Sequence, residues 1–261
     1  MKHWLENCEE HATCRHQVPG DLGPPARLIY ILESNGHLRA HVTEDISPST
    51  RYATLSHRWT ANPTLCLLSS NLTQLQLSIP LPALESVLHD AIVTTHNLGL
   101  SHLWIDSLCI IQDSPSDWES QSSNMGSIYK NAVCNLAAAT TQDQGFFVPR
   151  DPFSHYSPHL FLNWDPFQPA EHPSHDPVPL RGFYTLRDSA DWGINVTSAE
   201  LNQRGWVTQE RDLSPCTITF GQKQIYWKCG ELLACESFPN GIPGLDTYQM
   251  HYDTTPPTTQ P

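Results

Sequence analysis

The chain has 261 residues, of which 39% are hydrophobic, so it can bury the core of one large domain with additions. Its net charge is −13 with histidine neutral, and no run of Lys or Arg occurs, so we expect no electrostatic binding to nucleic acid or to an anionic membrane. No stretch approaches the roughly 18 consecutive apolar residues of a membrane-spanning helix. These properties exclude the main classes of nucleic-acid and membrane proteins.

The eight cysteines indicate a reducing compartment. The first residues, "MKHWLENCEEHATC", contain no long apolar segment of the kind found in secretory signals. Cysteines of a chain without such a signal stay as thiols in the cytosol or nucleus. We therefore expect a cytoplasmic protein with free cysteines.

The first half of the chain predicts a helix, a hairpin and a strand. The opening residues carry Trp4, Leu5, Cys8 and Ala12 on one helical face. The stretches "RLIYIL" and "HLRAHV" flank "ESNG", in which Asn35-Gly36 is the dipeptide that a tight hairpin turn prefers. "RYATLS" at 51–56 then predicts another strand.

The middle of the chain alternates between helical and strand patterns. Residues 81–100 predict a helix with Pro82 in its first turn and Gly99 at its end, and 116–133 predict a second helix. The apolar positions of these helices are Leu84, Val87, Leu88, Ala91, Ile92, Thr95 and Leu98, then Trp118, Met125, Ile128, Tyr129 and Ala132. "HLWI" at 102–105 and "CNLAAA" at 134–139 predict strands. This order predicts an α/β core with parallel pairing.

The last part of the chain predicts an insertion, a helix and a second hairpin. Residues 149–179 are rich in Pro, His and Asp and lack periodicity, which is typical of a surface insertion. "RGWVTQERDLS" predicts a turn that enters a short helix, and "CTITF" and "QIYWKC" predict a hairpin. The expected organisation is an extension of helix and hairpin at 1–51, an α/β domain at 52–236, and a disordered tail at 237–261.

Polar groups follow two of the predicted strands. In a parallel α/β sheet, functional groups gather beyond the carboxyl ends of the strands. "SHRW", with His57, Arg58 and Trp59, follows one strand, and "DSLC", with Asp106 and Cys109, follows another. A third cluster lies in "RGWVTQE", which supplies a guanidinium, an indole, an amide and an acid suited to a nucleotide or sugar. Its members are Arg204, Trp206, Gln209 and Glu210.

Each of these residues also has a purely structural interpretation. Asp106 could cap the turn that follows its strand. Cys109, between Leu108 and Ile110, is typical of a buried small hydrophobe, and a nucleophilic role would need exposure and a base such as His57. Glu210 could pair with a neighbouring arginine, and the tryptophans could belong to the core. From the residues alone, these alternatives stay open.

The segment "CEEHATCRH" holds four residues of metal-ligating type, Cys8, His11, Cys14 and His16. On one continuous helix, positions 8 and 11 share a face but 14 and 16 drift from it, so a tetrahedral site would require the helix to break. The chain also lacks a C-x-x-C pair, and "HPSHD" at 172–176 is a weaker metal signal within the insertion. We therefore predict no metal site and no cofactor.

Three blocks together resemble the fungal heterokaryon-incompatibility (HET) domain. They are "YATLSHRW" at 52–59, "LWIDSLCIIQDSPSDWESQSSNMGSIYKNAVCNLAAA" at 103–139 and "RGWVTQERDLSPCTITF" at 204–220, with the match spanning about 52–210. The upstream "WLENCEEHATC" is similar to a segment that often precedes that domain. One departure is Thr60, where the family usually has a glycine that can adopt a positive φ.

The resemblance implies a cytosolic domain of fungal self/non-self recognition whose activation triggers cell death after unlike hyphae fuse. It also implies a mostly parallel central sheet flanked by helices, TIR-like or flavodoxin-like, with added β-hairpins. Since some TIR domains cleave NAD with a glutamate, the alternatives are a small NAD- or nucleotide-hydrolysing enzyme and an enzyme of secondary-metabolite biosynthesis. A further alternative is a binding module that uses the insertion as its partner surface.

By position in the family blocks, the characteristic residues correspond to His57, Trp59, Asp106, Cys109, Gln112, Trp206, Gln209 and Glu210. We predict catalytic roles for His57, Asp106, Cys109 and Glu210. We predict ligand-binding roles for Arg58, Trp59, Gln112, Arg204, Trp206 and Gln209. The expected partners are a second copy of the chain or an incompatibility protein, together with a nucleotide or other small molecule.

Overall fold

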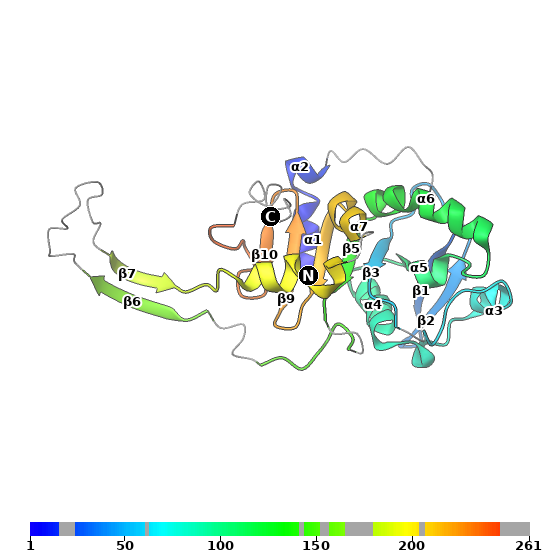
Figure 1. The fold of residues 1–261 in the computed structure, drawn as a ribbon, viewed down its shortest axis with the longest axis horizontal. Coiled ribbons are helices and arrows are strands. Elements are labelled where there is room, and N and C mark those ends of the chain that lie inside the picture. Colours follow the sequence, from blue (N-terminus) through cyan, green and yellow to red (C-terminus); the bar gives the residue numbers. More distant parts are fainter. Residues whose placement is uncertain are drawn as a thin grey trace, which may run out of the picture.

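A computed structural model describes residues 1–15, 24–60, 63–140, 144–151, 157–164, 180–203 and 207–245. Its main feature is an eight-stranded sheet with the order β10-β9-β8-β5-β3-β4-β1-β2 (Figure 1). The strands are β1 Leu28–Ser34, β2 His37–Thr43, β3 Ala53–Ser56, β4 His102–Trp104, β5 Cys134–Ala138, β8 Cys216–Phe220, β9 Ile225–Cys229 and β10 Leu233–Cys235.

The four middle strands are parallel and the outer strands are antiparallel. β3 pairs in parallel with both β4 and β5, and β5 pairs in parallel with β8. The β1–β2 hairpin continues the sheet antiparallel from β4, and β9 and β10 continue it from β8. The predicted α/β class, parallel core and added hairpins are therefore confirmed. A TIR-like or flavodoxin-like fold stays a prediction.

The first hairpin forms where its turn dipeptide predicted it. Asn35 and Gly36 have φ of 54° and 75°, the left-handed pair that a two-residue turn with right-handed strand twist requires. Ser34 pairs with His37 directly across this turn. Because β1 also pairs with β4, the predicted extension at 1–51 contributes two strands to the main sheet.

The helices are α1 Lys2–Cys8, α2 Ala12–Arg15, α3 Leu72–Leu77, α4 Ser86–Asn97, α5 Asp106–Cys109, α6 Pro115–Asn131 and α7 Val207–Leu213. Three short turns supplement them, η1 Leu81–Ala83, η3 Gly193–Thr197 and η4 Glu200–Gln203. α4 begins later than predicted, because Pro82 lies in the separate turn η1. Gly99, with a φ of 83°, ends this helix as expected.

Two apolar positions were predicted on the wrong surface. Ala12 lies in α2, after the break at the end of α1, and is exposed. Trp118 on α6 is 51% exposed, whereas Gln121 of the same helix is buried. The reason is that the first turns of α6 face the polar segment before β1, where the side-chain oxygen of Gln121 accepts a hydrogen bond from the nitrogen of Ala26 (3.4 Å).

The insertion contains an ordered strand that its composition did not predict. β6 (His159–Trp164) and β7 (Leu180–Thr185) form a separate antiparallel pair, which extends away from the main sheet in Figure 1. Phe161 and Phe183 lie side by side on this hairpin, with ring centroids 5.1 Å apart, and both are exposed. The insertion therefore supplies one strand of a projecting antiparallel pair, and the other strand, β7, follows the insertion.

Ordered structure also reaches further towards the end of the chain than the predicted boundary at 237. Ile242 is buried, and its nitrogen donates to the carbonyl of Leu233 (2.8 Å). Residues 246–261 of the predicted tail lie outside the described residues. Within the described part, none of the helices has the length and apolar character needed to cross a membrane.

Candidate functional site

The segments after β3 and β4 meet at one edge of the sheet. The parallel register places Thr54 beside Trp104, so the residues that follow these two strands emerge side by side. His57 follows β3 and is buried, and Asp106 begins α5 just after β4. The Nδ1 atom of His57 lies 3.9 Å from Oδ1 of Asp106. The structure thus brings these two predicted residues together.

Trp59 completes this arrangement. Its indole nitrogen donates a hydrogen bond to Oδ2 of Asp106 at 2.8 Å. Oδ1 of the same carboxylate accepts from the backbone nitrogen of Ser107 at 2.7 Å, and the Asp106 side chain remains 26% exposed. Asp106 therefore stabilises the start of α5 and also faces two side chains from β3. We call His57, Trp59 and Asp106 the Asp106 site.

Gln112 supports the backbone of the Asp106 site. Its side-chain nitrogen donates to the carbonyls of Asp106 (3.0 Å) and Ile110 (2.9 Å). Its backbone nitrogen also donates to the carbonyl of Leu67 (2.9 Å). Gln112 thus closes the turn of α5 onto the preceding loop, and the ligand-binding role predicted for it stays a prediction.

Cys109 lies within the core below this turn. Its exposed fraction is 0%, and its sulfur accepts a hydrogen bond from the nitrogen of Ile105 at 3.5 Å. Burial raises the pKa of the Cys109 thiol to about 12. A thiol that is neutral and shielded from solvent has little nucleophilic character, and these are the features of a packed small hydrophobe.

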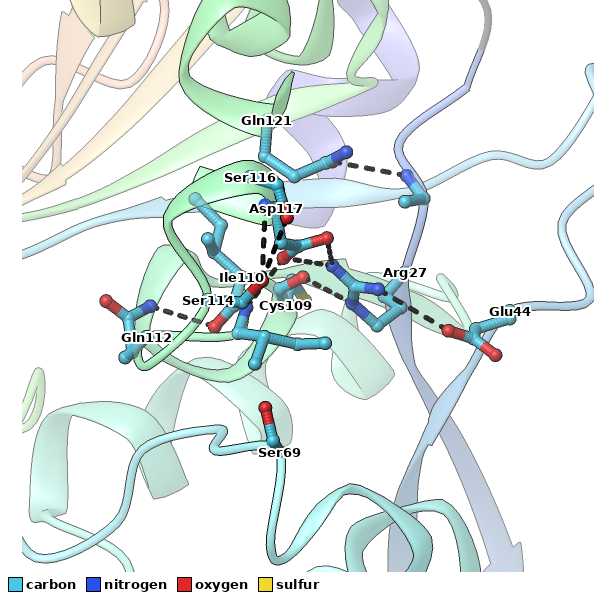
Figure 2. A network of polar contacts seen from close by, with 12 residues as sticks. Arg27, Glu44, Ser69, Cys109, Ile110, Gln112, Ser114, Ser116, Asp117 and Gln121 are labelled. Carbon is cyan, nitrogen blue, oxygen red and sulfur yellow. Dashed lines mark hydrogen bonds and ion pairs between the residues drawn. The ribbon is translucent and has the colours of Figure 1, made fainter. Parts of the chain in front are cut away.

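A buried ion pair holds the α5–α6 loop against the start of β1 (Figure 2). Arg27, which is 5% exposed, donates from Nε to the carbonyl of Cys109 at 2.8 Å and pairs through its guanidinium with the carboxylate of Asp117. Asp117 Oδ2 also accepts from the nitrogen of Ile111 at 2.8 Å, while Arg27 reaches Glu44 at 3.4 Å. This pair fixes the loop that follows α5, the helix that Asp106 begins.

Sequence reasoning missed both members of this ion pair. The pattern Ser114-x-x-Asp117 is a helix-start signal, and the Ser114 hydroxyl does accept from the Asp117 nitrogen at 3.4 Å. That signal identifies the start of α6 but not the arginine to which Asp117 binds. Arg27 is 90 residues away in sequence, and only the pairing of β1 with β4 brings it close.

The other predicted site residues lie apart from the Asp106 site or outside the described residues. Arg58 forms an ion pair with Glu200 of η4. Glu210 is buried on α7, which packs beside α6. Arg204, Trp206 and the side chain of Gln209 lie outside the described residues.

Thr60, the departure from the family pattern, has no positive φ, and its hydroxyl donates to Glu85 at 2.9 Å. The backbone beside Trp59 therefore accommodates a threonine at this position.

A small cavity lies over one face of β3, β5 and β8, where Ser56, Asn135 and Thr217 line it. Its floor is polar, because Ser56 and Asn135 exchange hydrogen bonds of 3.0–3.2 Å between β3 and β5. Arg211 of α7 and Lys228 of β9 supply positive charge at its wall. We call it the polar cavity. Neither Asp106 nor Glu210 is among the described residues that line it.

The Asp106 site lies within the part of the chain that matches a family of known proteins. A family model described as "Heterokaryon incompatibility protein (HET)" matches residues 52–210, which is more than half of the chain. The matched part includes the Asp106 site and Glu210, whereas Arg27 and the helices α1 and α2 lie before it. No curated protein and no solved structure matches the chain. On the extent of the family match, the chain belongs to the heterokaryon incompatibility (HET) family.

Proposed function

We propose that this chain is a cytoplasmic cell-death effector of heterokaryon incompatibility and that its activity depends on the Asp106 site. Membership of the HET family supports a role in incompatibility. The observation that carries the choice of site is the contact of one carboxylate with two side chains from the neighbouring strand end. Asp106 lies 2.8 Å from the indole nitrogen of Trp59 and 3.9 Å from Nδ1 of His57.

The geometry leaves the Asp106 carboxylate able to bind a further group. A carboxylate has about four lone-pair positions, and Trp59 and Ser107 each use one of them. Its side chain is partly exposed, while the neighbouring His57 is buried. A ligand hydroxyl or amine can therefore donate to Asp106 from the solvent side.

The test is inducible expression of the full chain in a filamentous fungus, with growth and viability as the measurements. We expect the wild-type chain to kill the cells. Asp106→Asn removes the negative charge, Trp59→Phe removes the indole donor, and both should reduce killing strongly. Glu119→Gln is the matched control, because Glu119 is an exposed acid on α6, and this variant should kill as efficiently as wild type.

Two results would contradict this proposal in different ways. Normal growth of cells that accumulate folded wild-type chain would exclude the effector function. Full toxicity of Asp106→Asn would retain the effector function but exclude the Asp106 site. Immunoblotting and thermal denaturation of each purified variant separate loss of activity from loss of folded protein.

A second candidate function is hydrolysis of NAD or a related nucleotide, and the polar cavity favours it. The cavity lies against one face of the parallel strands, and Arg211 and Lys228 at its wall could bind a phosphate there. Glu210 neighbours Arg211 on α7 and is the candidate catalytic acid. Purified chain should then release nicotinamide from NAD, and Glu210→Gln should abolish the release. Undiminished release by that variant would exclude Glu210 as the catalytic group.

A further inference from the structure

Four side chains of metal-ligating type meet where the N-terminal helices contact the β8–β9 hairpin. Cys8 ends α1, His11 lies between the two helices, Cys14 belongs to α2, and Cys229 ends β9. The ligand atoms of these four residues all lie within 4.8 Å of one another. The helix does break between Cys8 and Ala12, which is the condition that a tetrahedral site required of this segment. Cys229, far away in sequence, takes the place considered for His16.

The distances within this cluster suit a zinc ion. Nδ1 of His11 lies 3.8 Å from the sulfur of Cys14 and 3.4 Å from the sulfur of Cys229. Tetrahedral zinc with Zn–S bonds of about 2.3 Å and Zn–N bonds of about 2.0–2.1 Å separates sulfur from nitrogen by about 3.6 Å. The two observed separations lie on either side of that value. An ion can therefore occupy the centre with only small side-chain shifts.

We infer that Cys8, His11, Cys14 and Cys229 bind one zinc ion. Thiolates with one imidazole are a ligand set that selects zinc over hard cations such as magnesium and calcium. Four protein ligands leave no open position for water or substrate, so the ion is structural. Binding converts three neutral thiols to thiolates and releases their protons to solvent.

The backbone around the cluster is shaped to bring the ligands together. Oε1 of Glu231 accepts from both the nitrogen (2.7 Å) and the hydroxyl (2.9 Å) of Thr13, which fastens α2 to the turn after β9. Gly230 lies against Thr13 and Cys14 of α2. A Cβ at this position would be 3.0 Å from the Thr13 hydroxyl and 3.5 Å from the Cys14 sulfur. These contacts hold Cys14 beside Cys229 independently of any ion.

The proposed zinc joins parts of the chain that flank the family-matched region. Three ligands come before residue 52 and the fourth comes after residue 210. The ion would therefore fasten the N-terminal helices to the edge of the sheet on which β8, β9 and β10 lie. This assignment is independent of the proposed effector function. That function concerns the Asp106 site, which lies beyond the carboxyl ends of β3 and β4.

Cys216 provides a matched control within the same neighbourhood. It pairs with Cys229 across β8 and β9, and its sulfur donates to the carbonyl of Val133 at 3.3 Å. It is therefore a buried cysteine beside Cys8 whose thiol also has a backbone partner. Replacing Cys216 should disturb packing to a similar extent as replacing a ligand, but it should leave the ion in place.

The experiment measures metal in the full chain, purified under reducing conditions from cells grown with zinc. Elemental analysis should give about one zinc per chain, as a single four-ligand site requires. Addition of Co²⁺ to the metal-free chain should produce the visible bands of tetrahedral cobalt and the near-ultraviolet bands of cobalt–thiolate bonds. Cys14→Ser and His11→Asn should lose the zinc, whereas Cys216→Ala should retain it.

Several outcomes would overturn the assignment. The zinc assignment would be wrong if the reduced wild-type chain held no metal, or held iron in place of zinc. A cobalt spectrum without thiolate bands would also contradict it. Retention of zinc by both ligand variants would exclude these residues as ligands. A disulfide between two of the three cysteines in freshly prepared protein, detected by mass spectrometry, would replace the metal site with a covalent link. The wild-type cobalt spectrum decides the matter even if a ligand variant does not fold.

Discussion

Asp106 and Cys109 belong to the same turn of α5, yet their surroundings differ in kind. Asp106 keeps 26% of its side chain exposed and accepts hydrogen bonds from Trp59 and Ser107. Cys109, three residues later, has no exposed surface. The sequence predicts the turn and both chemical groups. Which group faces solvent depends on the packing of β1 and Arg27 beneath α5, and a local pattern does not carry that information.

The burial of Cys109 leads to a prediction about thiol reactivity. With iodoacetamide at pH 8, Cys66 should be alkylated in the folded protein because it is partly exposed, and Cys109 should not react. A thiol with a pKa of about 12 is ionised to only about one part in ten thousand at this pH. Peptide mapping by mass spectrometry gives the modified fraction, and a sample in urea should show both residues modified. Equal alkylation rates in the folded protein would contradict the buried position.

His102 predicts a dependence of stability on pH. Its ring lies 5.1 Å from that of Tyr30, which also contacts His41, and burial together with the nearby His41 lowers the pKa of His102. The unfolded chain therefore binds a proton near pH 6.5 that the folded chain binds only at lower pH. The free energy of unfolding should be unaffected by this group above that pH and should fall as the pH decreases below it.

Urea denaturation of wild type and His102→Gln at pH 7.5 and pH 5.5 checks this sign. The loss of stability between the two values should be smaller in the variant, because glutamine does not titrate. Acid-sensitive groups that do not interact with His102 contribute equally to both proteins and cancel in the difference. An identical loss in the two proteins would show that His102 does not carry part of the acid sensitivity.

At the scale of elements, local signals were reliable and long-range pairings were not. The Asn35-Gly36 turn, the end of α4 at Gly99 and the parallel pairing of β3 with β4 and β5 all follow from short patterns, because backbone chemistry or crossover rules decide them. The exposed position of Trp118 and the strand within the insertion did not follow. Both features depend on which distant segment packs against an element. Periodicity indicates only that one face of the element is apolar, not what covers that face.

The ion pair between Arg27 and Asp117 should contribute strongly to stability, because it links the start of β1 to the first turn of α6. Arg27→Met and Asp117→Asn should each lower the free energy of unfolding by about 1–3 kcal/mol, because each removes the charged partner of a largely buried group. The double variant should lose less than the sum of the two, by about 0.5–3 kcal/mol. Urea denaturation of the four proteins gives this coupling energy.

The exposed pair Arg51–Glu9 serves as the control for that cycle. Both of its side chains are more than half exposed, at 60% and 54%, so Arg51→Met should cost only about 0–1 kcal/mol. Additive losses at Arg27 and Asp117 would mean that the pair does not act as a unit. In that case the α5–α6 loop would be held by the remaining hydrogen bonds of Asp117 and Gln112.

At the scale of the whole molecule, the folded unit is larger than the family-matched region. β1 and β2 continue the sheet from β4, and β8, β9 and β10 complete it beyond β5, although all of these strands lie outside residues 52–210. Trp4 of α1 packs against Trp227 of β9 with ring centroids 6.1 Å apart. Contacts between residues more than 200 positions apart leave no trace in a local pattern, and the same limit hid Cys229 from the cluster that begins at Cys8.

Trp4 therefore tests whether the N-terminal segment is part of the core. Its indole nitrogen donates to the carbonyl of Pro239 at 2.7 Å, and its ring is buried, so Trp4→Ala should lower the free energy of unfolding by about 3–5 kcal/mol. Lys2→Ala, at an exposed position on the same helix, should change it by less than about 0.5 kcal/mol. Denaturation curves for both variants, followed through tryptophan fluorescence and circular dichroism, give the comparison. A small effect of Trp4→Ala, or a separate early transition confined to the fluorescence signal, would mean that α1 docks on an already complete fold. A single cooperative transition shifted to lower denaturant would place residues 2–8 in the same folding unit as the sheet that carries the Asp106 site.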